Sequence, residues 1–400
     1  RRNARMATQA PILQDSCFKD RAHGESLVKA NNHFALDLYQ HTIKSESKNV
    51  FFSPLSIFTA LCMTYGGSRD RTASEMEEVM HLAPLNQEIH CIFKELLGSL
   101  KSPSADYQLN MANKIYAKDD HPFLQDFISM IQTEYIADIE KVNFAKDVEA
   151  IRQNINGWVE AETANKIKDL IPGGVLNALT RLVLINAVYF KGDWATQFKH
   201  DDTENDAHFL MSDKDVVKVD MMNLQAEFPM EYLRDLKTKV LELPYVNNQL
   251  SMVILLPDER NGISELESKL TVDILQSVCN PVRRRKMKVN VALPRFKLEQ
   301  SFDLGNSLKT LGMKQLFKEG SADLSGIDGT KELYVSKVLH KAFVEVNEEG
   351  SEAAAATAVV MRMRCMPAPT PDFRCDHPFM FIIKDNRSNA ILFMGKLASP

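Results

Sequence analysis

The chain has 400 residues, of which 44% are hydrophobic and 25% are charged, and its formal net charge is −5. The length allows one large domain or two ordinary ones, and the acidic balance argues against a nucleic-acid-binding protein. No apolar run approaches the ~18 residues that a membrane-spanning helix needs. The six cysteines are widely spread without a CxxC pair, so neither a disulfide scaffold nor a zinc finger is expected.

The first predicted element is a helix that starts the folded region. Leu27, Ala30, Phe34 and Leu38 recur at helical spacing, and Ser26 just before them is a candidate N-cap. The pattern therefore predicts a helix capped by Ser26.

Residues 53–68 carry stronger boundary signals. Ser53 suits the N-cap, Pro54 the first helical position, and the two glycines at 66–67 the C-terminal end. Nearly every side chain between them is apolar, which predicts a helix that is buried on all sides.

Strands dominate the chain after a further amphipathic helix predicted over 147–163. Residues 181–190 are almost continuously apolar, as in a central strand covered on both faces. Residues 286–296 alternate between apolar and polar side chains, which predicts a half-buried strand. Two apolar runs, 378–385 and 390–397, flank a turn-forming sequence and predict a hairpin. Since there is no repeat or long linker, one intertwined α+β domain is expected.

Motifs of familiar enzymes are missing from the sequence, including GxSxG, HExxH, GxGxxG and the P-loop. Histidine, serine and aspartate residues occur singly and in no catalytic spacing. We therefore predict no catalytic residues, no cofactor and no metal.

One unusual segment lies near the C-terminus, where residues 348–365 read EEGSEAAAATAVVMRMRC. Alanine is the best helix former, so local propensity favours a helix. As a strand, residues 351–364 would carry their charges, Glu352, Arg362 and Arg364, on one face and would place small residues and then large ones on the other. That uncharged face could enter between existing strands without overpacking. Because the segment could lie either in an exposed loop or between the strands of a sheet, we expect a conformational switch.

The hinge EEGSEAAAAT resembles that of the inhibitory serpins. Other segments are similar to further hallmark sequences of that family, namely 49–61 (NVFFSPLSIFTAL), 186–194 (NAVYFKGDW), 336–350 and 376–400. The resemblance runs in order from about residue 26 to the end and is strongest to the ovalbumin-like branch. It implies a single serpin domain over 26–400, preceded by an N-terminal extension over 1–25.

The resemblance implies an α+β serpin fold with three β-sheets, eight or nine helices and an exposed reactive-centre loop at about 348–376. In that family a target serine protease cleaves the loop and forms an acyl-enzyme, and the N-terminal half of the loop then inserts into the main sheet. The trapped protease is carried to the opposite pole and distorted. We therefore expect a metastable, monomeric inhibitor without enzymatic activity that forms a covalent complex with its target.

Counting as in that family, seventeen residues from Glu348 place the reactive bond at Arg364–Cys365. Arginine fits the acidic pocket of trypsin-like proteases, which are the expected targets. Two alternative registers are Met363–Arg364, which suits a chymotrypsin-like protease, and Arg362–Met363. The hinge comprises Glu348, Glu349, Gly350, Ser351, Glu352, Ala353, Ala354, Ala355, Ala356 and Thr357. The small, uncharged Ser351 favours inhibition over the alternative, a non-inhibitory serpin with a chaperone, carrier or storage role.

Four further positions match the family's polar cluster beneath the main sheet, where the central strands separate: Ser53, Ser56, Asn186 and His340. His340 can also be explained as a satisfied core histidine, and both interpretations give it no catalytic part. Trp194 matches the tryptophan at the entry point of the loop, and it can also be explained as a core aromatic residue.

Two surface features are left open by the sequence. Five basic residues form either a solvated face or a weak site for heparin-like glycosaminoglycans: Arg283, Arg284, Arg285, Lys286 and Lys288. Asn386 begins an Asn-Arg-Ser sequon, which can be glycosylated only if the chain is secreted. An extracellular location is expected, with a cytoplasmic one as the alternative because residues 1–25 show no signal-peptide pattern.

Overall fold

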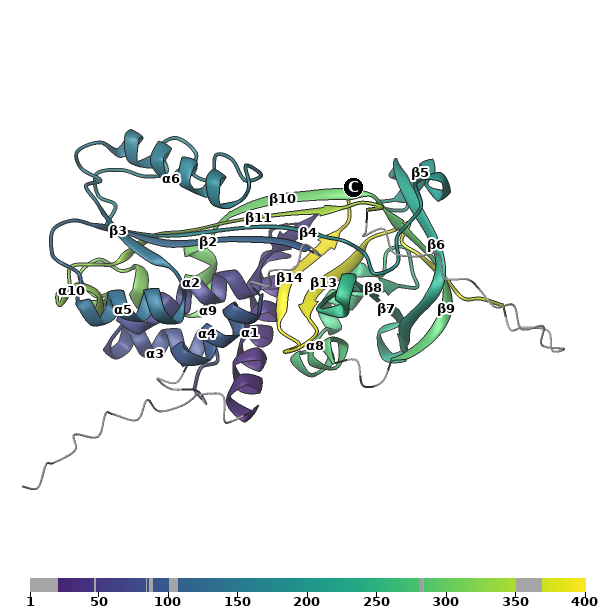
Figure 1. Ribbon diagram of the computed structural model, residues 1–400, viewed down its shortest axis with the longest axis horizontal. Coiled ribbons are helices and arrows are strands. Elements are labelled where there is room, and N and C mark those ends of the chain that lie inside the picture. Colours follow the sequence, from purple (N-terminus) through teal and green to yellow (C-terminus); the bar gives the residue numbers. More distant parts are fainter. Residues whose placement is uncertain are drawn as a thin grey trace, which may run out of the picture.

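The computed structural model describes residues 21–46, 48–83, 85, 89–100, 107–280, 282, 284–349 and 369–400. In this part of the chain the strands form two sheets, and helices cover both faces of the smaller one: α2, α4, α5 and α9 on one side and α6 on the other (Figure 1). The helices are α1 (Arg21–Thr42), α2 (Pro54–Gly67), α3 (Asp70–Val79), α4 (Ile89–Leu100), α5 (Gln125–Glu134), α6 (Val148–Glu162), α7 (Ile263–Lys269), α8 (Val272–Cys279), α9 (Gly305–Leu311) and α10 (Ser325–Asp328). The strands are β1 (Val50–Phe52), β2 (Tyr107–Lys118), β3 (Asp138–Val142), β4 (Leu182–Gly192), β5 (Glu204–Leu210), β6 (Val216–Leu233), β7 (Thr238–Pro244), β8 (Leu250–Pro257), β9 (Arg285–Pro294), β10 (Phe296–Asp303), β11 (Val335–Val346), β12 (Asp372–Arg374), β13 (Phe379–Asp385) and β14 (Ile391–Leu397).

The smaller sheet has five strands in the order β10-β11-β4-β2-β3. Its central strand, β4, pairs in parallel with β11 and antiparallel with β2. Every residue of β4 except Lys191 is buried, because helices cover both faces of the sheet. This confirms the central strand that the apolar run at 181–190 predicts.

The larger sheet has nine strands, and the long strand β6 holds it together. β6 pairs with β5 and β9 along most of its length and with β7 at its end. This shared strand joins what would otherwise be two sheets, so the described residues form two hydrogen-bonded sheets with ten α-helices, instead of three sheets with eight or nine. The predicted α+β class is confirmed.

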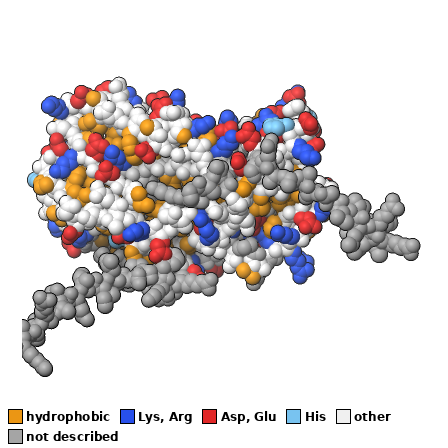
Figure 2. All heavy atoms as spheres, viewed as in Figure 1, with side chains coloured by type: hydrophobic (Ala, Val, Ile, Leu, Met, Phe, Trp, Pro, Cys, Tyr) orange, Lys and Arg blue, Asp and Glu red, His pale blue; other side chains and the backbone are white. Residues whose placement is uncertain are grey.

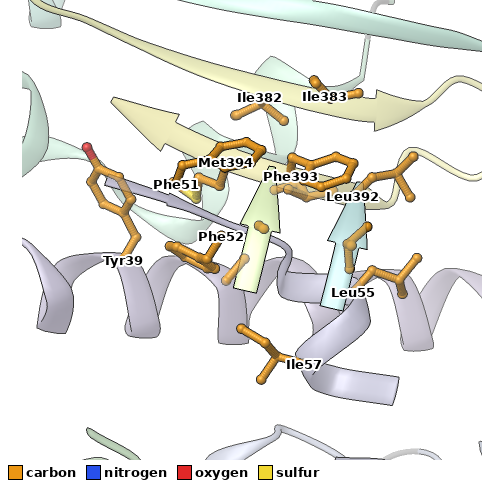
Figure 3. Packing of buried hydrophobic residues seen from close by; sticks show 14 of the residues in the cluster. Tyr39, Phe51, Phe52, Leu55, Ile57, Ile382, Ile383, Leu392, Phe393 and Met394 are labelled. Atoms are coloured by element: carbon orange, nitrogen blue, oxygen red, sulfur yellow. The ribbon is translucent and has the colours of Figure 1, made fainter. Parts of the chain in front are cut away.

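The predicted C-terminal hairpin, β13 and β14, forms the centre of the main core. The two strands pair antiparallel, and all seven residues of each are buried. Figure 3 shows Phe51 of β1 and Leu55 of α2 packed near Leu392 and Phe393 of β14. The rings of Phe51 and Phe393 stack with their centroids 5.4 Å apart. Burial of these aromatic rings is a large source of stability.

The predicted boundaries of α2 are confirmed. The Ser53 side chain accepts a hydrogen bond from the Ser56 N–H at 3.3 Å, Pro54 occupies the first helical position, and the helix ends at Gly67. The helix predicted over 147–163 is α6, which is capped by Asp147.

The prediction for Ser26 is wrong, because α1 already begins at Arg21 and Ser26 lies inside it. Good helix formers such as Ala22 and Glu25 extend the helix beyond the predicted cap. The predicted boundary between extension and domain, after residue 25, therefore also falls within this helix. Although α1 has 22 residues, no described helix is both long and apolar enough to cross a membrane.

The predicted strand at 286–296 is β9 followed by the start of β10, and its alternation is only partly confirmed. Val289, Val291 and Leu293 are buried, but Met287 is exposed. The first four residues of β9 are exposed whichever face they occupy, so this end of the strand lies outside the core.

Candidate functional site

The boundary between β4 and β11, here called the seam, lies at the centre of the five-stranded sheet next to the predicted hinge. The two strands pair from Leu182 opposite Val335 to Lys191 opposite Glu345. The chain leaves the sheet after β11, and the next strand among the described residues is β12, in the other sheet. Parallel pairing is slightly less stable per residue than antiparallel pairing. The seam is therefore a place where an antiparallel strand could replace a weaker pairing.

One rung across the seam is polar. Asn113 of β2 lies opposite Asn186 of β4, which lies opposite His340 of β11. His340 Nδ1 contacts Asn186 Oδ1, and the Asn186 amide nitrogen donates to Asn113 Oδ1 and to the Ser56 carbonyl oxygen at 3.0 Å. The Ser53 N–H donates to His340 Nε2 at 3.1 Å. The start of α2 is thus bonded to both sides of the seam.

His340 is fully buried, and its hydrogen-bond partners fix its tautomer. Because the Ser53 N–H donates to Nε2, the ring proton lies on Nδ1 and is donated to Asn186. Burial lowers the pKa of His340 to about 3, so the ring is neutral at pH 7. Its two nitrogens are both engaged within the protein, which makes this histidine a structural link and not a general base.

The structure thus brings together the four predicted polar residues Ser53, Ser56, Asn186 and His340. The Ser53 hydroxyl also donates to the Leu392 carbonyl oxygen at 2.7 Å, which connects this network to β14. Asn113 also belongs to this network but was not predicted, because only the register of β2 against β4 places it opposite Asn186. That the network acts as a gate in the seam stays a prediction.

Trp194 lies where β11 leads into the hinge, as expected. Its indole Nε1–H donates to the Asn347 carbonyl oxygen at 2.9 Å. The ring is almost fully buried and stacks on Tyr245 with 4.5 Å between centroids. Trp194 is therefore both a core aromatic residue and a direct contact of the chain that leaves β11.

Glu348, the first hinge residue, is held in a buried ion pair, with 1% of its side chain exposed. Arg295 donates to both carboxylate oxygens, from Nε at 3.0 Å and from Nη2 at 2.5 Å, and the Thr203 hydroxyl donates at 2.8 Å. Burial alone would raise the pKa of Glu348, but the hydrogen bonds from Arg295 and Thr203 outweigh it and lower the pKa to about 2.

Glu349 is anchored differently. Its carboxylate pairs with Lys191 Nζ of β4 at 2.5 Å, and 57% of its side chain is exposed. The hydrogen bond and charge of Lys191 lower the pKa of Glu349. The first two residues of the predicted hinge are thus tied to opposite flanks of the seam, Glu349 to β4 and Glu348 to the residue between β9 and β10.

The other predicted functional residues of the loop lie outside the described residues. They are the hinge residues Gly350, Ser351, Glu352, Ala353, Ala354, Ala355, Ala356 and Thr357, and the reactive-bond candidates Arg362, Met363, Arg364 and Cys365. Cys375, near the end of the predicted loop range, is a buried free thiol, so the exposed loop ends before it.

The predicted polyanion site is corrected at Arg284. Its guanidinium pairs with Glu231 at 3.2 Å and Glu242 at 2.5 Å, and only 1% of its side chain is exposed, so its charge is already neutralised inside the protein. Arg283 lies outside the described residues, while Arg285, Lys286 and Lys288 are exposed on β9. On the face shown in Figure 2, basic and acidic side chains are interspersed.

The predicted glycosylation site at Asn386 stays a prediction, but its side chain is hydrogen-bonded in the folded turn. The Asn386 amide nitrogen, which would carry the glycan, donates to the Asn248 carbonyl oxygen at 3.0 Å and to the Ser251 hydroxyl at 2.8 Å. The Asn386 side-chain oxygen accepts from Lys384 at 2.7 Å. A glycan would replace one of the two N–H groups of this amide, so the folded turn could keep at most one of the two groups as a donor.

Comparisons with known proteins agree with this architecture. A family model described as Serpin (serine protease inhibitor) matches residues 29–400. The leukocyte elastase inhibitor of Equus caballus is 43% identical over 381 residues, and Serpin B3 of Homo sapiens is 41% identical over 390 residues. Each match covers 94% of this chain and all of the relative.

Solved structures show the same fold. Uncleaved ovalbumin superposes with a TM-score of 0.87 at 31% identity and covers 94% of this chain, and maspin superposes with 0.88 at 29% identity and covers 95%. Both structures are matched over 100% of their length. The expected serpin fold and the likeness to the ovalbumin-like branch are confirmed. The chain belongs to the serpin family.

Proposed function

We propose that this chain is a suicide-substrate inhibitor of Arg-specific, trypsin-like serine proteases. The family is described as one of serine protease inhibitors, and several relatives are named leukocyte elastase inhibitor. The observation that carries the proposal is the parallel seam of β4 and β11 beside an alanine-rich hinge.

The topology supports insertion into the seam. A segment that leaves β11 and turns back runs antiparallel to β11, and therefore also to β4, so its entry would replace one parallel pairing by two antiparallel ones. At about 1 kcal/mol net per hydrogen bond, an inserted strand of roughly fifteen residues would contribute on the order of 10 kcal/mol. This is comparable to the total stability of an ordinary domain and is enough to distort a tethered protease.

Arg364 supports the specificity. The elastase pocket is small, whereas the trypsin pocket carries an aspartate that pairs with a long cationic side chain. The target is therefore expected to differ from the elastase in the relatives' names. The registers at Met363 and Arg362 are the alternatives that the experiment must separate.

The fold alone does not decide between inhibition and ligand carriage. Human thyroxine-binding globulin, whose name states what it binds, superposes with a TM-score of 0.84 at 29% identity. The comparisons give no support to an extracellular location or to a heparin-like partner, so the proposal includes neither.

The test is incubation with trypsin, chymotrypsin and elastase, followed by a denaturing gel and mass spectrometry of the released C-terminal peptide. We expect an SDS-stable complex with trypsin and a peptide that begins at Cys365. Arg364→Ala should abolish the trypsin complex, whereas the matched control Arg362→Ala should retain it. Clean cleavage without a complex would support the carrier or storage role and contradict the proposal.

The hinge provides a second test. Ser351→Arg places a charge on the face that would enter the sheet, where its desolvation is costly. The variant should be cleaved at the same bond but form little complex. Full complex formation by this variant would contradict the insertion mechanism while leaving the specificity intact.

A further inference from the structure

Three metal-ligating side chains lie together between α1 and the end of α3, remote from the hinge. His33 and Asp37 are four residues apart on α1, so they share one face of the helix. His81 follows α3, and one ligand atom from each of the three residues lies within 4.8 Å of the others. Figure 1 shows α3 and β5, which lies beside the hinge contact Thr203, at opposite ends of the molecule. The sequence predicted no metal site because His81 is far from the other two along the chain.

His81 occupies an unusual backbone position. The N–H of Leu82 donates to the Glu77 carbonyl oxygen at 2.9 Å and that of His81 to Glu78 at 3.3 Å, as in a Schellman helix end. The residue at this place is usually glycine, because its φ is left-handed, and His81 has a φ of 58°. The strained histidine is held by a contact of its ring, since Nε2 lies 2.7 Å from Asp37 Oδ2.

The two imidazoles face each other. The rings of His33 and His81 stack with 3.5 Å between centroids and an angle of 3°, and His33 Nε2 lies 3.9 Å from Asp37 Oδ1. The two rings and the Asp37 carboxylate therefore lie within reach of a single ion between α1 and the end of α3.

We propose that His33, Asp37 and His81 bind a divalent transition-metal ion such as Zn²⁺, with water completing the coordination. Two imidazole nitrogens and a carboxylate oxygen are a ligand set that proteins use for zinc. An imidazole binds metal in the plane of its ring, so one of the two parallel rings must rotate when the ion enters. The His33 side chain is 38% exposed and has room to do so. The ion would then join α1 to the end of α3.

The test uses the full chain after treatment with a chelator. Calorimetric titration with Zn²⁺ should show one ion per chain, and saturating Zn²⁺ should raise Tm. The decisive variant is His81→Gly, because glycine suits the left-handed position and removes the ligand without straining the helix end. We expect this variant to fold and to lose both responses. Asp37→Asn should weaken binding at least tenfold.

Two controls exclude nonspecific effects. His41→Gln removes a histidine one turn further along α1 but outside the cluster, and it should leave zinc binding unchanged. Mg²⁺ prefers oxygen ligands and should give neither response. The proposal fails if the wild-type chain binds no Zn²⁺, or if His81→Gly binds it with the same stoichiometry and affinity. Neither result depends on protease inhibition.

Discussion

The C-terminal hairpin and the seam are both buried, but they are held together by different interactions. β13 and β14 pair antiparallel and pack their aromatic side chains into the main core. β4 and β11 pair in parallel, and the polar contact between Asn186 and His340 crosses between them. An inserted strand would move these two residues to about 10 Å apart, twice the usual strand spacing. Under the proposed insertion, the contacts of the seam would be exchanged, whereas those of the equally buried hairpin would be kept.

The largest expected effect is on the hairpin. Phe393 packs on Phe51 and on Phe190, with centroids 5.4 and 5.5 Å away. Phe393→Ala should lower the free energy of unfolding by about 3–5 kcal/mol, because it removes a buried ring and leaves a cavity. Urea and thermal unfolding measure this change. A cost below about 1 kcal/mol would show that the hairpin is not the permanent part of the core.

The next effect tests the seam. Asn186→Ala leaves the ring N–H of His340 without its partner and should cost about 2–3 kcal/mol. It should also shorten the lifetime of the intact inhibitory form on warming, since less then holds β4 to β11. The measurement is the loss of complex-forming activity with time.

Asn156→Ala is the matched control for this variant. Asn156 is also buried and binds both backbone polar groups of Ile171, but on α6 and outside the seam. It should destabilise the protein similarly without accelerating the loss of activity. Equal acceleration in the two variants would remove the distinction between seam and core.

A pH experiment sharpens the comparison through His340. Its pKa is about 3 in the folded chain and about 6.5 when unfolded, so below pH 6.5 the unfolded state binds a proton that the folded state does not. Stability is therefore lost as pH falls from 6.5 towards 3, by up to about 1.4 kcal/mol per pH unit. Between pH 7 and 5 the wild type should lose about 2 kcal/mol more than His340→Gln. Parallel pH profiles of the two proteins would contradict a buried neutral histidine.

The smallest predicted difference lies at the hinge. Glu348→Gln removes a carboxylate that is buried against Arg295 and should cost about 1 kcal/mol at pH 7. Glu349→Gln changes an exposed pair with Lys191 and should cost less than about 0.5 kcal/mol. The pKa of Glu348 is about 2, so its contribution is present above pH 4.5 and is lost as pH falls through 2. Equal costs for the two variants at pH 7, measured by Tm, would be inconsistent with the buried clamp.

Local chemistry explains which features the sequence could predict. The ends of α2 could be predicted because their signals act on adjacent residues. These signals are the cap at Ser53, the proline after it and the terminal glycines. The continuous apolar sequence of β4 likewise predicts that both faces of this strand are buried. The wrong cap at Ser26 arose because a capping residue is also tolerated within a helix whose neighbours favour it.

Features that depend on contacts between residues far apart in the sequence could not be predicted from it. Asn113 joins the polar rung only because the register places it opposite Asn186. Arg284 looked like part of a basic surface because its acidic partners, Glu231 and Glu242, come from other strands. That β6 links strands into one nine-stranded sheet among the described residues likewise depends on pairing between distant segments.

The most direct test of the account compares the thermal unfolding of the intact chain with that of the chain cleaved at Arg364. If the cut loop enters the seam, the cleaved protein gains two antiparallel pairings and should unfold at a markedly higher Tm than the intact one. An unchanged or lower Tm after cleavage would mean that the intact chain stores no free energy between β4 and β11, and the proposed mechanism would be wrong.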